Sequence, residues 1–111
     1  MKNNEHRDLF PGALEMMILR TLKRQPLHGY ALAQYIKRTS NDLLQIEEGS
    51  LYPALQRMSS DKWLRAQWGT TDTGRKARFY TITPAGRRQL EIEEERWGLL
   101  TEAVNRALRF A

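Results

Sequence analysis

A change in apolar periodicity along the chain constrains the fold more than any other feature. As far as Asp61, apolar residues recur every three or four positions, which is typical of amphipathic helices. From Leu64 to Ile82 they alternate with polar residues, as in half-buried strands, and beyond Pro84 the helical period returns. Because 111 residues have room for one domain with a modest core, the sequence predicts a single, mainly helical α+β fold.

Three helices are expected before the strands. The first follows Pro11-Gly12 and is stopped by Gln25-Pro26, and the second follows a turn at His28-Gly29 and ends at residues 39–41. After a connector that is extended at residues 44–46, Gly49-Ser50 offers an N-cap for a third helix, which ends near Asp61. The apolar stripe of this helix is narrow, so most of its surface is polar. This stripe consists of Leu51, Leu55 and Met58.

A β-hairpin with a basic tip is predicted next. Its strands cover residues 64–69 and 77–82, and the segment between them is rich in turn residues and closes with Arg75 and Lys76. Three helices followed by such a hairpin are the order of elements in a winged helix-turn-helix domain. In that fold the third helix enters the major groove of DNA and the hairpin, or wing, lies on the adjacent backbone. We therefore expect this fold with a two-stranded wing.

The distribution of charge supports a nucleic-acid partner. The net charge is +5, and residues 62–88 hold seven basic side chains against Asp72 alone, although such a cluster can also be a solvated face. The predicted contacts to double-stranded DNA lie on the third helix and the wing. They are Ser50, Tyr52, Gln56, Arg57, Arg75, Lys76 and Arg78.

Each of the helical candidates has a structural alternative. Ser50 could serve only as the N-cap, Tyr52 could pack on the second helix, and Gln56 and Arg57 could be solvated. Four further residues are predicted to be structural rather than functional. These are His28 and Tyr30 near the start of the second helix, and Trp63 and Trp68 at the hairpin, although Tyr30 could either pack or contact the DNA backbone.

A long helix is expected from Pro84 to the end of the chain. Thr83 is a suitable cap, proline suits the first helical position, and after the first turn the pattern is interrupted only at Gly98. Leu90, Trp97 and Val104 recur every seven residues and form an apolar seam. A domain of residues 1–83 cannot cover a helix of residues 84–111, although the two form one structural unit, so the sequence predicts a homodimer. The expected interface consists of Leu9, Phe10, Leu14, Leu90, Trp97, Leu100, Val104 and Leu108.

Four runs of sequence carry a family resemblance. They are LEMMILRTL, PLHGYALAQYI, EEGSLYPALQRM and RKARFYTITPAGRRQL, and the match of which they are part extends from about Pro11 to Leu90. In this order the chain resembles the PadR family of phenolic-acid-type repressors, in its smaller branch with one C-terminal helix. The resemblance implies transcription regulation by a homodimeric repressor on a pseudo-palindromic operator, with Tyr52 at the DNA face. One departure is Lys62, which replaces the glycine usual after the third helix and puts the left-handed helix stop in doubt. A lysine here could lengthen the helix or contact a phosphate.

Trp97 lies near a position that has a ligand role in related proteins. In multidrug-sensing relatives of this architecture, a tryptophan of the dimer helix and its symmetry mate enclose flat aromatic ligands. The resemblance therefore implies a small aromatic effector at Trp97, and stacking on an indole pair is physically reasonable. The alternative is that Trp97 is simply an apolar residue of the seam.

Several functional classes do not fit the sequence. The chain has no cysteine, its two histidines, His6 and His28, are far apart, and its glutamates at 91–95 lie on a solvated helix face, so we expect no enzyme, metal site or cofactor. No apolar run approaches the ~20 residues of a membrane span, which predicts a cytoplasmic protein. The remaining alternative is a winged-helix adaptor that binds proteins instead of DNA. The clustered cations of the wing argue against that alternative.

Overall fold

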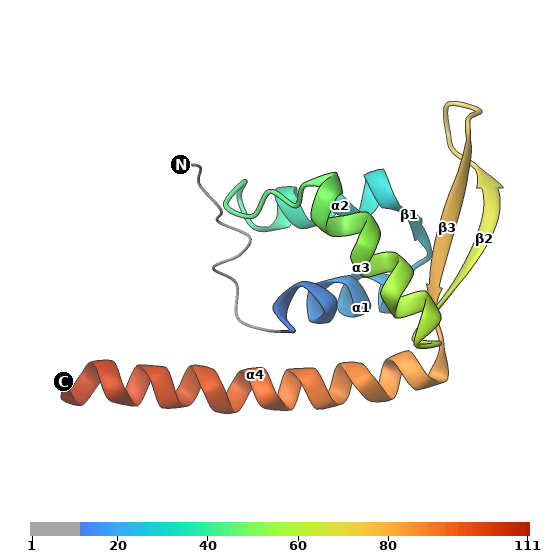
Figure 1. The fold of residues 1–111 in the computed structure, drawn as a ribbon. Coiled ribbons are helices and arrows are strands. Elements are labelled where there is room, and N and C mark those ends of the chain that lie inside the picture. Colours follow the sequence, from blue (N-terminus) through green and yellow to red (C-terminus); the bar gives the residue numbers. More distant parts are fainter. Residues whose placement is uncertain (1–11) are drawn as a thin grey trace.

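The chain forms four helices and a small sheet over the residues that the computed structural model describes, 12–111 (Figure 1). In chain order these are α1 (Ala13–Arg24), β1 (Leu27–His28), α2 (Gly29–Thr39), α3 (Glu48–Ser60), β2 (Leu64–Thr70), β3 (Lys76–Ile82) and α4 (Pro84–Phe110). The expected winged helix-turn-helix order is confirmed. Figure 1 shows the β2–β3 hairpin projecting from one end of the helical body, while α4 runs beneath α1 and α3.

One core joins the three short helices, the sheet and the beginning of α4. The apolar stripe predicted for the third helix, Leu51, Leu55 and Met58, belongs to this core, and each fully buried aliphatic side chain stabilises the fold by about 1.5–3 kcal/mol. The largest fully buried side chains are Ile18, Leu19, Leu32, Leu51, Leu55, Met58 and Leu90. Leu90 belongs to α4, so the long helix starts as part of the domain rather than as a separate arm.

The sheet has three antiparallel strands in the order β1-β3-β2, whereas the sequence predicted only the hairpin. In β1, Leu27 pairs with Tyr80 and His28 pairs with Phe79. The expected turn at His28-Gly29 is therefore partly a strand. Nδ1 of His28 also accepts a hydrogen bond from the amide of Ala31 at 3.4 Å, which caps α2. The prediction that His28 is structural agrees with both contacts.

The start of α3 differs from the prediction. The helix begins at Glu48, after an extended Glu47, so Ser50 lies inside the first turn and is not the N-cap. The carbonyl of Glu47 accepts from the amides of Ser50 and Leu51 at 3.0 and 2.9 Å, and the turn forms without a side-chain cap. The stretch expected to be extended at 44–46 forms no strand within the described part of the chain, because it packs on the core instead of beside the sheet.

The end of α3 settles the conformation of Lys62. The helix ends at Ser60, and Lys62 has φ of +67°, so it adopts the left-handed conformation despite its side chain. The amide of Trp63 donates to Met58 and that of Lys62 to Ser59, both at 3.0 Å, which is the hydrogen-bond pattern of a Schellman helix end. The suggestion that lysine lengthens α3 is therefore wrong. The backbone hydrogen bonds impose the stop.

The long helix α4 begins as predicted. The hydroxyl of Thr83 accepts from the amide of Gly86 at 3.0 Å, and Pro84 occupies the first turn. A Cβ atom on Gly86 would lie 2.2 Å from the carbonyl oxygen of Trp63, so only glycine allows α4 to approach the α3–β2 connection this closely. Along α4 every residue from 99 to 110 is exposed, and Figure 1 shows this end of the helix running past the start of α1.

The predicted interface residues fall into four groups. Leu90 is 1% exposed and packs in the core of its own protomer, so its assignment to the dimer interface is wrong. Leu9 and Phe10 lie outside the described residues, and Leu14 packs partly buried against the core. The other four residues keep large exposed surfaces on α4. These are Trp97, Leu100, Val104 and Leu108.

Candidate nucleic-acid interface

The polar face of α3 presents most of the predicted contact residues. The buried stripe of α3 faces the core, which turns Tyr52, Gln56 and Arg57 toward solvent. Ser50 is partly exposed in the first turn. A helix anchored on one side and polar on the other can present side chains to base edges in the major groove.

Tyr52 both packs and remains accessible. Its ring lies against Gly29 at the start of α2, where a Cβ atom would come within 2.7 Å of Cε1, and its side chain is still 42% exposed. Burial, together with the charge of Glu48 and the proximity of Tyr80, raises the pKa of Tyr52 above its usual value. The hydroxyl therefore stays neutral at physiological pH and can donate a hydrogen bond. The two alternatives of the sequence analysis, packing and surface contact, are compatible.

Arg57 is held by the first helix. Its guanidinium forms an ion pair with the carboxylate of Glu15, which comes from α1, 42 residues earlier in the chain. This contact joins α3 to α1 on the exposed surface. A DNA contact by Arg57 would have to share or replace this partner, so the residue also serves to connect the two helices.

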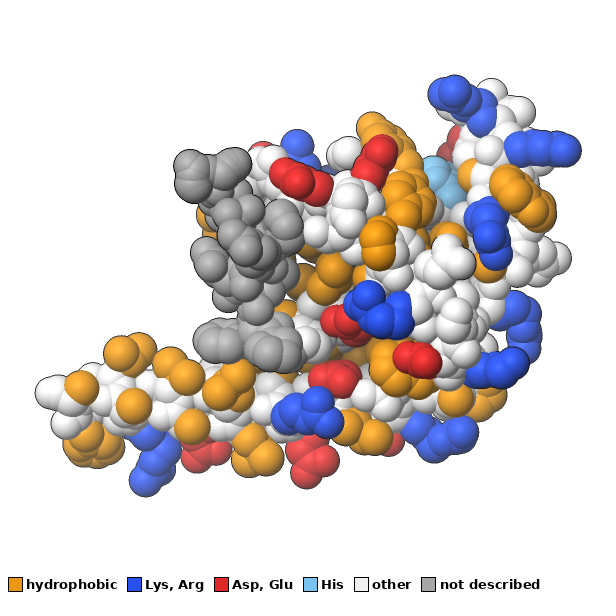
Figure 2. Space-filling view, in the orientation of Figure 1, with side chains coloured by type: hydrophobic (Ala, Val, Ile, Leu, Met, Phe, Trp, Pro, Cys, Tyr) orange, Lys and Arg blue, Asp and Glu red, His pale blue; other side chains and the backbone are white. Residues whose placement is uncertain are grey.

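The wing places two of its predicted cations on one face of the sheet and the third in its turn. Trp68 lies directly opposite Arg78 and Thr70 opposite Lys76, so these residues share the sheet face that carries the core farther down. Arg75 lies in the turn between the strands, and all three predicted cations are exposed. Figure 2 shows Lys and Arg side chains spaced along the hairpin side of the molecule.

A hollow of about 450 Å³ connects the wing with α2 and α3. Predicted contact residues from two elements meet at its wall, with Tyr52 and Gln56 on α3 and Lys76 and Arg78 on β3. Ser50, Arg57 and Arg75 are not part of this wall. The structure thus brings four of the seven predicted residues together around one concave surface.

Two aromatic residues of this surface were not expected there. Trp68 is 67% exposed and Tyr30 is 64% exposed, and both line the hollow. The assignment of Trp68 as a packing residue is therefore wrong, and for Tyr30 the exposure contradicts packing but not the alternative of a backbone contact. The alternation of β2 correctly puts Trp68 on the inward face, but the core ends before reaching it. Trp63, by contrast, is partly buried against the core, as predicted.

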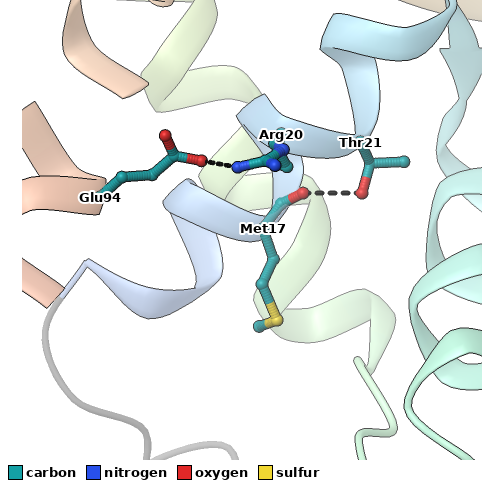
Figure 3. A network of polar contacts seen from close by, with 4 residues as sticks. All are labelled: Met17, Arg20, Thr21 and Glu94. Carbon is teal, nitrogen blue, oxygen red and sulfur yellow. Dashed lines mark hydrogen bonds and ion pairs between the residues drawn. The ribbon is translucent and has the colours of Figure 1, made fainter. Parts of the chain in front are cut away.

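A second, apolar hollow of about 500 Å³ lies between α1, α2 and α4. Its wall includes Met17, Tyr35, Leu44 and Trp97. At its edge the Glu94 carboxylate of α4 pairs with Arg20 of α1, as Figure 3 shows. Trp97 also lines a neighbouring hollow of about 290 Å³. Within residues 12–111, no group of three or more potential metal ligands lies together.

The long helix α4 carries charged as well as apolar residues along its length. None of the helices in the described part of the chain is long and apolar enough to cross a bilayer. The charged residues of α4 include Glu93 and Glu94, and the Glu93 carboxylate accepts a hydrogen bond from Nε2 of Gln89 at 2.8 Å. The helix α4 is thus an amphipathic element on the surface of the domain.

The fold and the concave surface define a winged helix-turn-helix protein. Residues 18–92 match the transcriptional regulator PadR-like family, which covers more than half of the chain, and the chain therefore belongs to that family. The resemblance found in the sequence is confirmed. At this level the chain is a transcriptional regulator.

Solved structures and curated relatives agree with this assignment. A PadR-like transcriptional regulator from Bacillus cereus is 32% identical, with 87% of this chain and 92% of that chain covered and a TM-score of 0.75. A transcriptional regulator from Clostridium thermocellum has 26% identity, 86% and 92% coverage, and a TM-score of 0.79. A transcriptional regulator of Mycobacterium tuberculosis is 33% identical over 84 residues, which cover 76% of this chain and 75% of the relative.

Proposed function

We propose that the protein is a homodimeric repressor that binds a pseudo-palindromic DNA operator. The observation that carries this proposal is the concave surface on which polar residues of α3 meet basic residues of the wing. Gln56 is suited to hydrogen bonds with base edges, while Lys76 and Arg78 are suited to phosphates. Binding at a promoter would repress by excluding the transcription machinery.

The exposed apolar seam of α4 supports the homodimer. Trp97, Leu100 and Val104 are each 37% exposed, and Leu108 is 72% exposed, so the described protomer leaves part of this apolar stripe open to solvent. A second copy covers this stripe best, because the seven-residue spacing makes it complementary to itself. Twofold symmetry then places two α3 helices on half-sites about 34–36 Å apart.

The apolar hollows at Trp97 support a flat aromatic effector. The indole lines both hollows; the larger lies between α1, α2 and α4, and the smaller lies between α4 and the start of α1. A ligand bound there changes operator affinity only if it binds more tightly to a dimer conformation with one spacing of the two α3 helices than to a conformation with another spacing. This relates the proposed effector site to the proposed DNA surface.

The salt dependence of DNA binding tests the repressor proposal. The probe is a labelled duplex of the promoter region upstream of the protein's own gene, and the variant combines Arg75→Ala, Lys76→Ala and Arg78→Ala. We expect wild-type affinity to fall steeply as salt concentration rises. For the variant, the slope of log affinity against log salt concentration should be shallower by up to about 0.9 for each phosphate that it no longer neutralises. An Arg109→Ala variant, altered at the far end of α4, is the control and should keep the wild-type slope.

Two results would count against the proposal. Absence of wild-type binding even at low salt would favour the adaptor alternative, and the partner would then be a protein. Binding with equal slopes for wild type and triple variant would mean that the wing makes no phosphate contacts.

A further inference from the structure

The wing exposes a tryptophan that the fold does not use. On the inward face of the hairpin, the Leu64–Ile82 pair is buried, at 3% and 7% exposure, and in the next pair Tyr80 is still buried. One pair farther along, Trp68 opposite Arg78 is 67% exposed. The core thus ends one pair before Trp68. A side chain of this size normally buries a large apolar area, so its exposure here leaves that area available to a partner outside the protomer.

Phe79, on the opposite face of the wing, is an aromatic residue that packs against other parts of the fold and serves as a comparison for Trp68. Phe79 points outward and lies across Gly69, where a Cβ atom would be 2.8 Å from its ring. The Phe79 and His28 rings also form an edge-to-face contact at a centroid distance of 5.2 Å. Phe79 is accordingly only partly exposed. Trp68, on the inward face, has no comparable enclosure.

Arg78 holds the indole at the surface. Its guanidinium carbon lies 5.9 Å from the centre of the Trp68 ring, within the range of a cation–π contact. The arginine covers part of one ring face and places a positive charge beside an apolar plate. Lys76 follows on the same inward face, at the next position toward the wing tip.

The chemistry of the neighbouring surface favours duplex DNA as the partner. Trp68, Lys76 and Arg78 line the same hollow as Tyr52 and Gln56, the residues that carry the proposed contacts of α3. A partner that fills this hollow must offer negative charge to two cations and an apolar surface to the indole. The deoxyribose edge of a DNA strand provides both, because each sugar is flanked by phosphates. Stacking on a single-stranded base fits less well, since Arg78 already lies over the ring.

We infer that Trp68, positioned by Arg78, packs against the sugar edge of duplex DNA and supplies a salt-independent part of the binding affinity. This inference rests on the proposed DNA-binding function. Phosphate contacts release counterions and therefore determine how steeply affinity falls with salt, whereas an apolar contact does not. The two kinds of contact on the wing can be separated by one titration.

The test compares wild type with four variants on one duplex, recovered by the wild type from a library of random duplexes. We expect Trp68→Ala to weaken binding about tenfold or more at every salt concentration with an unchanged slope. Trp68→Phe should retain most of the affinity, because it keeps an aromatic plate. Lys76→Ala should lower the slope by about 0.9. The control Gln67→Ala alters the exposed residue next to Trp68 on the opposite face of β2 and should bind like wild type.

A second readout observes Trp68 directly in the full chain. With fluorinated tryptophan incorporated at all three positions, the fluorine resonance missing from Trp68→Phe identifies Trp68. That resonance should shift on addition of the duplex and not on addition of either single strand. If the Trp68 resonance shifts with single strands and not with the duplex, the inference is wrong, and Trp68 stacks on bases of single-stranded DNA instead.

The outcomes distinguish this inference from the proposed function. If wild type recovers and binds a duplex but Trp68→Ala binds equally well, the inference fails and the DNA-binding proposal stands. A reduced slope in Trp68→Ala would likewise overturn it, because the interaction made by Trp68 would then be coupled to phosphate neutralisation. If wild type binds no duplex, both fail together. Unfolding curves of Trp68→Ala matching those of wild type verify that the exposed side chain is not needed for folding.

Discussion

Replacing Lys62 by glycine is expected to stabilise the protein. Lys62 has φ of +67°, and the left-handed conformation costs a residue with a Cβ atom about 1–2 kcal/mol. The backbone cannot relax, because the amides of Lys62 and Trp63 close the end of α3 and the Lys62 carbonyl accepts from the hydroxyl of Thr83 at 2.6 Å. Glycine loses about 0.5–1 kcal/mol more conformational freedom on folding. The free energy of unfolding should therefore rise by roughly 0.5–1 kcal/mol.

The assay is thermal and urea unfolding at one fixed protein concentration. For a domain of this size the gain corresponds to a rise in Tm of about 2–6 °C. Lys62→Ala is the matched control, because it removes the charge and keeps the Cβ atom, and it should gain no stability. Equal stability of Lys62→Gly and Lys62→Ala would refute the reasoning, since the strain attributed to the Cβ atom would then be absent.

Close packing and burial lead to three further predictions. Gly86→Ala should lower the free energy of unfolding by about 2–4 kcal/mol, measured by urea unfolding, because its Cβ atom meets the Trp63 carbonyl; a decrease below about 0.5 kcal/mol would contradict the close approach. Leu90→Ala should cost about 2–5 kcal/mol by the same measurement, whereas Leu108→Ala should leave the unfolding of the isolated protomer nearly unchanged. Because the pKa of Tyr52 is raised in the folded state, its contribution to stability is present below about pH 10 and is lost as pH rises through the folded pKa. Tyr52→Phe should therefore lose less stability than wild type above about pH 10. Parallel plots of the free energy of unfolding against pH for the two proteins would disprove this.

Local signals in the sequence were sufficient for the helices and the hairpin. Thr83 and Pro84 mark the start of α4 by their own chemistry, and the predicted cap is the one found. The strands of the wing follow from alternation together with a turn-rich connection. In these elements each signal comes from residues adjacent in sequence. Where the start of α3 was misplaced, a good capping residue, Ser50, was present but not used.

Features that depend on distant residues could not be predicted in the same way. The strand β1 has two residues and exists only because Phe79 and Tyr80 lie beside it. The Arg57–Glu15 pair joins residues 42 positions apart, and no pattern near either residue indicates it. Such contacts form only when the helices pack together.

The candidate site shows the limit of periodicity most clearly. Alternation assigns Trp68 to the inward face of the hairpin correctly, but it does not reveal how far the core extends along that face. Leu90 shows the converse, since its place in a seven-residue repeat suggested an interface while the core of its own protomer already buries it. The apolar period shows which face of a helix or strand is apolar, and the packing of neighbouring elements determines whether that face is buried.

Selection of binding sites from a random duplex library tests the central claim most directly. A homodimer with one α3 helix on each half-site should enrich an inverted repeat whose half-site centres lie about 10 base pairs, or a multiple of one helical turn, apart. The same protein should contact both half-sites in a footprint of the selected duplex. Enrichment of no sequence, or of a single half-site without symmetry, would contradict the account of a dimeric operator-binding repressor.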